Sequence, residues 1–148
     1  MIRQAEASDE PEIKACAEQA YARYVPLIGR KPAPMVADFL AQIAAGTVYV
    51  ATDEQAAFQG FIVFYPEHED MLLENVAVLP SAAGRGVGKA LICFCEAVAR
   101  QRGMARVHLY TNEKMTANLS MYPKLGYVEV ARRMEDGFKR VYFEKKLG

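Results

Sequence analysis

The chain has 148 residues and a mass of 16.5 kDa, the size of one domain, and we expect a single domain over residues 1–148. Hydrophobic residues make up 52% of the chain and charged residues 24%, which excludes disordered and fibrous classes. The 18 Lys and Arg residues balance the 18 Asp and Glu residues, so no net charge attracts the chain to nucleic acid or to an anionic membrane.

The N-terminal third predicts one strand and two helices. Residues 2–5 favour a short strand, and apolar residues then recur at helical spacing over 10–23. Three prolines and a glycine make 25–34 an irregular connection. A second helix is expected over 35–45.

The remainder predicts strands alternating with two helices. Three consecutive strands, rich in β-branched and aromatic residues, are expected over 47–51, 61–65 and 71–78. A helix over 87–102 follows, with one apolar face: Val87, Leu91, Phe94 and Val98. After it come a strand over 107–110, a short helix over 115–122, and a hairpin of strands 127–134 and 138–146 that turns at Asp136-Gly137.

This order of elements favours an α/β fold of the α+β type. Three consecutive strands argue for a mixed, mostly antiparallel central sheet rather than a doubly wound parallel one. We expect six to seven strands flanked by about four helices. Strand 71–78, helix 87–102 and strand 107–110 form one βαβ crossover.

The three cysteines, Cys16, Cys93 and Cys95, are too few and too unevenly spaced for a disulfide framework. Each lies in an apolar stretch, which predicts thiols buried in the core. Unpaired thiols are typical of a reducing compartment, and no apolar run approaches the ~20 residues of a membrane span. We therefore expect a cytoplasmic protein.

The loop between strand 71–78 and helix 87–102 predicts an anion site. Its three glycines leave room for a ligand near the backbone: Gly84, Gly86 and Gly88. Unpaired N–H groups at the helix N-terminus, together with Arg85 and Lys89, favour a phosphate. Lys89 breaks the Rossmann fingerprint, and Ala90 lacks the hydroxyl with which a P-loop holds Mg²⁺. Of the phosphate-binding motifs considered, the loop therefore fits a diphosphate that is bound by backbone amides without a metal ion.

The residues around this loop resemble a motif of the GCN5-related N-acetyltransferase (GNAT) family. The segments ENVAVLP (74–80) and GRGVGKALI (84–92) are similar to its acetyl-CoA motif, and NLSMYPKLGY (118–127) to its second signature. Both occur in the family's order and spacing. The resemblance implies a GNAT-type sheet with the acyl-CoA site at the central βα turn and acetyl-CoA as the acyl donor.

The resemblance also implies which residues bind the coenzyme. The strand backbone would take the thioester and pantetheine arm through Val76, Ala77 and Val78, where a splayed strand exposes N–H donors. The loop would hold the diphosphate through Gly84, Arg85, Gly86, Val87, Gly88 and Lys89. Two positions depart from the family pattern: Ala83 replaces a Gln or Arg, and Met115 replaces an Asn, for which Asn118 is the alternative.

Tyr122 is the predicted general acid, because the resemblance places its hydroxyl where it can protonate the departing thiolate. The alternative is a purely structural tyrosine, since Met115, Leu119 and Tyr122 share one helical stripe.

Glu74 is the predicted general base, because it interrupts an apolar strand where a carboxylate is costly unless it faces a cleft or a partner. A solvated position, a salt bridge, or an amine that needs no base are the alternatives. His68, in an acidic turn, and His108, within a strand, are weaker candidates.

Acceptor choice is assigned to the first two helices, their connection from Tyr24 to Pro34, and the final hairpin. Arg30 or Lys31 in that connection would suit a carboxylate-bearing amine. Solvated strand faces are expected to hold most of the C-terminal basic residues: Arg132, Arg133, Arg140, Lys145 and Lys146.

The predicted function is acetyl-CoA-dependent N-acetyl transfer, directly to a primary amine of a small molecule or peptide. A catalytically silent acyl-CoA-binding regulatory module and a nucleotide-binding regulator are the alternatives. The expected partner is the amine acceptor, with neither nucleic acid nor membrane, and the sequence leaves a homodimer open.

Overall fold

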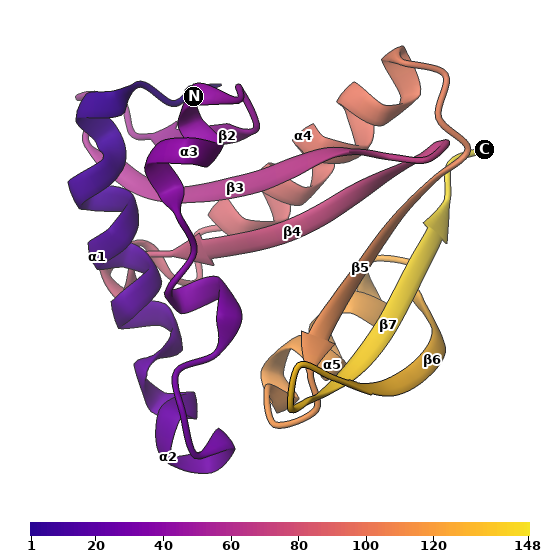
Figure 1. The fold of residues 1–148 in the computed structure, drawn as a ribbon. Coiled ribbons are helices and arrows are strands. Elements are labelled where there is room, and N and C mark those ends of the chain that lie inside the picture. The colour runs from indigo at the N-terminus through magenta and orange to yellow at the C-terminus, as the bar shows by residue number, and fades with distance from the viewer.

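A computed structural model describes residues 1–148 and contains one seven-stranded sheet of order β1-β2-β3-β4-β5-β7-β6 (Figure 1). The strands are β1 (Ile2–Gln4), β2 (Val48–Thr52), β3 (Phe58–Glu67), β4 (Asp70–Val78), β5 (Arg106–Asn112), β6 (Val128–Glu135) and β7 (Phe138–Lys146). The helices are α1 (Glu10–Tyr21), α2 (Val25–Ile28), α3 (Phe39–Ala44), α4 (Val87–Gln101) and α5 (Thr116–Lys124). Only β4 and β5 pair in parallel, which confirms the mixed, mostly antiparallel sheet.

Two hydrophobic cores lie on opposite faces of the sheet. One packs α1 and α3 against it, and the other packs α4 and α5 against it. The alternation of β3 serves both, because Phe61 and Val63 enter the first core while Ile62 and Phe64 enter the second. A strand buried on both faces reads as the continuous apolar run seen in the sequence. None of the helices combines the length and apolar composition needed to cross a lipid bilayer.

The predicted second helix is wrong in its extent. Residues 35–45 form the end of a 3₁₀ turn, η3 (Ala33–Met35), followed by the shorter helix α3. The Asp38 side chain caps α3 by accepting a hydrogen bond from Ala41 N at 3.1 Å, so the helix begins after it. The predicted irregular connection contains one helical turn, α2, which ends at Gly29 with φ +91°.

The buried face of α4 differs slightly from the predicted one. Leu91, Ile92 and Cys95 are fully buried, whereas Val87, Phe94 and Val98 are only partly buried. Cys16 and Cys95 are buried as predicted. The prediction for Cys93 is wrong, because its side chain points away from the sheet and is exposed.

The parallel pair β4–β5 holds together at one end only. Its pairing consists of Met71 with Val107 and Leu72 with His108, after which the two strands diverge (Figure 1). Beyond Leu72, β4 is therefore hydrogen-bonded to β3 along one edge and free along the other. This confirms the predicted splay and leaves backbone donors of β4 available to a ligand.

Candidate active site

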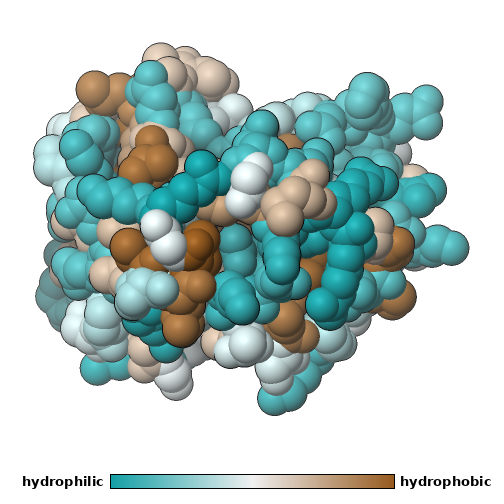
Figure 2. Space-filling view, turned by 60° about the horizontal axis from the view of Figure 1, so that its bottom comes forward, coloured by the Kyte–Doolittle hydropathy of each residue, from teal (hydrophilic) through white to brown (hydrophobic).

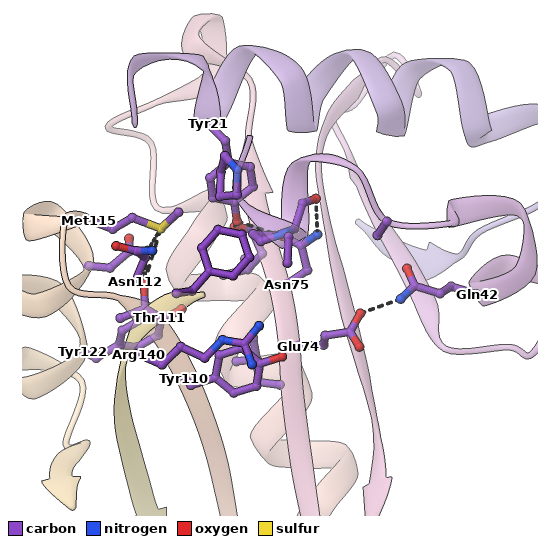
Figure 3. Close-up of a pocket in the computed structure, with 18 of the residues that line it drawn as sticks. Tyr21, Gln42, Glu74, Asn75, Tyr110, Thr111, Asn112, Met115, Tyr122 and Arg140 are labelled. Carbon is purple, nitrogen blue, oxygen red and sulfur yellow. Dashed lines mark hydrogen bonds between the residues drawn. The ribbon is translucent and has the colours of Figure 1, made fainter. Parts of the chain in front are cut away.

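A cavity of about 290 Å³ fills the space between the diverging strands. The middle of β4 forms one wall, the end of β5 with α5 and the start of β7 forms another, and η3 with α3 covers the side (Figure 3). The face of the molecule in Figure 2 is mostly hydrophilic, with a compact hydrophobic group left of centre and smaller hydrophobic patches elsewhere. The cavity is lined by both apolar and polar side chains, and the polar ones are those able to hydrogen-bond to a ligand or exchange a proton with it.

A β-bulge in β4 brings two consecutive polar residues to this cavity. Val63 pairs with Asn75 while Phe64 pairs with Leu73, so Glu74 has no partner on β3. An extra residue changes the phase of side-chain alternation. Glu74 and Asn75 therefore both line the cavity, although neighbouring residues of a regular strand point to opposite faces.

Glu74 is held by neutral hydrogen-bond donors. Its carboxylate accepts hydrogen bonds from the Tyr65 hydroxyl, at 2.7 Å, and from the Gln42 side chain. Burial, reinforced by this carboxylate, raises the pKa of Tyr65, which therefore stays a donor. No Lys or Arg side chain lies within 4 Å of Glu74, so the salt bridge considered from the sequence is not formed. The carboxylate faces the cavity with lone pairs available to a proton.

Asn75 and Tyr21 anchor β4 to the helices beside it. The Asn75 amide donates to Pro34 O at 3.0 Å, and its oxygen lies 2.8 Å from the Tyr21 hydroxyl. Tyr21 also lies 3.0 Å from Val76 O. Sequence reasoning missed both residues. The available signal was the pair Glu74-Asn75, because two adjacent polar residues put a polar side chain on both faces of a strand that is otherwise apolar.

Tyr122 belongs to the core and to the cavity at once. It is 4% exposed, packs against the rings of Tyr127 and Phe143 at centroid distances of 5.6 and 5.8 Å, and lines the cavity. Burial, with a smaller effect of Cys95, raises the pKa of Tyr122, and no hydrogen bond contributes to the shift. The phenol is therefore protonated, and no group of the chain pairs with its hydroxyl.

Asn118 and Met115 lie beside Tyr122 at the start of α5. The Asn118 amide donates to the Thr111 hydroxyl at 3.1 Å, and Thr111 donates to Met115 Sδ at 3.4 Å. All three line the cavity. The Asn118 carbonyl oxygen has no partner within the chain, so it remains able to accept a hydrogen bond from a ligand.

The glycine loop presents main-chain donors. Gly86 precedes α4 with φ +80°, and a Cβ added there would meet nothing within 4 Å. Ala90 N is the first amide of the helix that bonds back, to Gly86 O at 2.9 Å, so the amides from Val87 to Lys89 have no backbone partner. Arg85 and Lys89 are exposed beside them. Open space, free donors and positive charge together fit a diphosphate.

Of the other predicted residues, those on β4 lie near the cavity or the glycine loop, and the two histidines lie away from the cavity. Val76 lines the cavity, Ala77 is buried against the α1 side, and Val78 ends β4 before the glycine loop. His68 lies in an exposed turn with φ +57°, and His108 Nε2 lies 3.5 Å from Glu67 on β3. Neither histidine lines the cavity.

Two basic residues depart from the prediction of a solvated face. Lys145 on β7 has a half-buried side chain whose Nζ lies 3.0 Å from the buried Glu96 carboxylate and donates to Leu125 O at 2.8 Å. Arg140 on β7 lines the cavity, and its side chain is only 11% exposed. The exposed Arg30 reaches the β6–β7 turn, donating to Asp136 O and lying 3.7 Å from the Phe138 ring centroid. The connection and the final hairpin, both assigned to acceptor choice, therefore meet at one end of the cavity.

Comparison with known proteins gives a family match. The sequence model of the acetyltransferase (GNAT) domain matches residues 44–129, more than half of the chain. A structure of PaiA N-acetyltransferase from Thermoplasma acidophilum in complex with coenzyme A has a TM-score of 0.79 at 17% identity, covering 99% of this chain and 98% of that one. At this identity the likeness concerns the fold.

Two curated relatives match shorter segments. Mycothiol acetyltransferase of Salinispora tropica is 45% identical over 53 residues, which are 35% of this chain and 17% of that protein. Glucosamine 6-phosphate N-acetyltransferase of Trypanosoma brucei brucei is 43% identical over 63 residues, 42% of this chain and 40% of that protein. The chain thus spans less than half the length of either relative.

Proposed function

The chain belongs to the GNAT acetyltransferase family, and we propose that it is an acetyl-CoA-dependent N-acetyltransferase. In this proposal the acetyl group passes directly from the thioester to a primary amine of a small molecule or peptide. The observation that carries it is the cavity where β4 and β5 diverge, because it gathers a carboxylate and a protonated phenol beside a free strand edge.

The coenzyme sites follow from the free donors. The loop from Gly84 to Lys89 would hold the diphosphate through backbone amides and the positive end of α4, without a metal ion. The unpaired edge of β4 from Val76 to Val78 would bind the pantetheine arm, and Asn118 would supply one further contact. That a similarly folded acetyltransferase has been solved in complex with coenzyme A supports coenzyme A as the ligand.

Glu74 and Tyr122 would serve opposite ends of the reaction. Glu74, directly or through water, accepts a proton from the ammonium group of the acceptor, which frees the nitrogen lone pair. The nitrogen attacks the thioester carbon, a C–N bond forms and the C–S bond breaks. Tyr122 gives its proton to the departing sulfur, and the attacking nitrogen, positively charged once the C–N bond has formed, loses its second proton through water to the Tyr122 phenolate. Glu74 returns the first proton to solvent, and the products are the amide and the CoA thiol. An acceptor that arrives deprotonated needs no base.

The test is an amine panel in which release of the CoA thiol is measured, with equilibrium binding of acetyl-CoA measured in parallel. Binding with thiol release on addition of an amine supports the transferase. Binding with no release across the panel favours the silent acyl-CoA-binding module. Absence of acetyl-CoA binding together with magnesium-dependent binding of ATP contradicts the proposal, and Ala90 argues against that outcome because it offers no hydroxyl to magnesium.

A further inference from the structure

Arg140 is a cation that the proposed chemistry does not use. It projects from β7 into the cavity that also contains Glu74 (Figure 3), and its side chain is 11% exposed. A guanidinium with so little exposed surface has lost much of its hydration, which is costly unless hydrogen-bond partners replace the lost water. The groups that contact Arg140 therefore indicate whether its role is structural or ligand-binding.

Aromatic rings stack against the planar face of the Arg140 guanidinium, whereas the N–H groups along its edge have no hydrogen-bond partner in the chain. The guanidinium carbon lies 4.4 Å from the Tyr110 ring centroid and 5.7 Å from that of Phe138. The one carboxylate within 4 Å is that of Asp136, at 3.7 Å, which is beyond hydrogen-bond distance and 83% exposed. None of the Arg140 nitrogens is sealed away from solvent. A planar group with five N–H donors thus has no acceptor in the chain.

A second cation strengthens the positive charge. Arg133 lies directly opposite Arg140 in the β6–β7 register and stacks on Tyr142 at 4.8 Å. Like charges directly opposite each other on neighbouring strands destabilise a sheet. Arg133 is exposed and does not line the cavity, so it adds to the positive potential around Arg140 without itself contacting a ligand in the cavity.

The other wall of the cavity is negative. Glu74 and Asp38 line it, and neither forms an ion pair. Tyr110 experiences the charges of both walls. Burial raises the pKa of its phenol, the positive charge of Arg140 lowers it, and the negative charge of Glu74 raises it further. A ligand that fits such a cavity has a cationic or amine end and an anionic end.

We propose that the acceptor is a primary amine that also carries a carboxylate or phosphate group. Arg140 binds the anionic group through its open edge, while the amine faces Glu74. A guanidinium fork suits both oxyanions because two N–H groups can bond to two oxygens. This inference rests on the proposed N-acetyltransferase function and names its acceptor class.

The experiment uses matched acceptors that differ in the anionic group. The full chain is assayed with acetyl-CoA and β-alanine against β-alaninamide, L-amino acids against their amides, and O-phosphoethanolamine against ethanolamine. We expect the anionic member of at least one pair to have the higher kcat/KM, by about 10- to 100-fold, the range of a charge-assisted hydrogen bond. The pair that responds distinguishes carboxylate from phosphate.

Arg140→Gln should lower this preference by a similar factor, and Arg140→Lys by less, because lysine keeps the charge and loses the fork. Lys139→Gln is the matched control, since Lys139 is the neighbour of Arg140 on β7, is 65% exposed and does not line the cavity. It should keep the full preference. Thermal melting of each variant shows whether it is folded.

Two results overturn the proposal: equal use of neutral and anionic acceptors, or a preference that survives in folded Arg140→Gln. Either one leaves the N-acetyltransferase function standing, since amines are still acetylated. If no acceptor is turned over, the same pairs are titrated calorimetrically onto the protein with CoA present. Binding that ignores the anionic group then contradicts the acceptor class, whereas failure to bind acetyl-CoA contradicts the underlying function.

Discussion

Single side chains carry the proposed chemistry, and their contacts distinguish catalytic from structural roles. The Tyr122 hydroxyl bonds to nothing in the chain while its ring packs against Tyr127 and Phe143. The aromatic ring of Tyr122 therefore contributes to the core, while its hydroxyl is available for proton transfer.

Tyr122→Phe tests that division. The substitution removes one proton donor and keeps the ring, so we expect turnover to fall by roughly 10²-fold or more. Acetyl-CoA affinity should stay within about twofold and the melting temperature should barely change, because no hydrogen bond is lost. Rates of CoA release and calorimetric titration measure both quantities. Unchanged turnover would remove Tyr122 from the mechanism.

Glu74→Gln tests the base. Glutamine can keep neutral contacts to Tyr65 and Gln42 but cannot accept the proton of the acceptor. We expect turnover to fall by about 10²-fold near pH 7 and to recover toward the wild-type rate as the pH approaches about 10, where a primary amine deprotonates unaided. Glu69→Gln, in the exposed β3–β4 turn, is the control. A loss that does not depend on pH would point to a structural role instead.

At the scale of elements, two junctions of strand and helix decide binding and stability. The β4–α4 junction holds Gly86 at φ +80°, which costs an L residue roughly 1–2 kcal/mol. A side chain at this position would also project into the open space where we propose that the diphosphate binds.

Gly86→Asp should therefore abolish measurable acetyl-CoA binding, since it adds both a side chain and a negative charge at the helix N-terminus. Gly86→Ala, which adds only the methyl group, should weaken binding less. Equilibrium binding on folded protein measures each. Retained affinity in Gly86→Asp would place the coenzyme elsewhere.

The β1–α1 junction depends on Asp9. Its carboxylate accepts two hydrogen bonds from Arg3, at 2.8 and 2.9 Å, and one from Glu6 N at 2.7 Å. The Arg3 hydrogen bonds, with that of Glu6 N, lower the pKa of Asp9 against the opposing effect of burial. A pKa lower in the folded than in the unfolded chain means that this stability is present above about pH 3.8 and is lost as the pH falls through the folded value.

Asp9→Asn should lower the free energy of unfolding at pH 7 by about 1–3 kcal/mol, since Arg3 and the Glu6 amide lose a charged acceptor. The difference between wild type and variant should shrink below pH 4. Urea unfolding at several pH values measures it. A difference that stays constant down to pH 2 would contradict this role.

At the scale of the whole molecule, the sheet is two halves joined weakly. Strands β1 to β4 and strands β5 to β7 share only the two residue pairs at the start of β4 and β5, and the candidate site occupies the gap. A ligand bound in that gap would contact both halves of the sheet and would therefore stabilise the folded protein against unfolding.

Saturating CoA should therefore raise the melting temperature. At 100 times its dissociation constant, binding adds about 2.7 kcal/mol, which corresponds to a shift of roughly 5–10 °C for a domain of this size. Differential scanning calorimetry with and without CoA measures it, and Gly86→Asp is the control without the site. An equal shift in that variant would show that CoA acts elsewhere.

Local pattern determined much of this protein. The strands, helix α4, the hairpin turn and the glycine loop depend on neighbouring residues, because alternation, capping and φ preference act over a few positions. The family resemblance rested on the same short motifs. The start of the second predicted helix was misjudged, because the Asp38 side chain caps α3 and the helix begins after it.

The cavity itself was decided by tertiary structure. The bulge at Glu74 depends on the register with β3, and the burial of Arg140 depends on β7 lying between β5 and β6. A basic residue on a hairpin looks solvated until the strand order places it beside a gap, since burial is set by segments distant in sequence. The sequence therefore determined the glycine loop proposed to bind the coenzyme, because its glycines and the helix N-terminus are adjacent in the chain. Only strand pairing decided that Arg140 and Glu74 line the same cavity, because burial depends on segments distant in sequence.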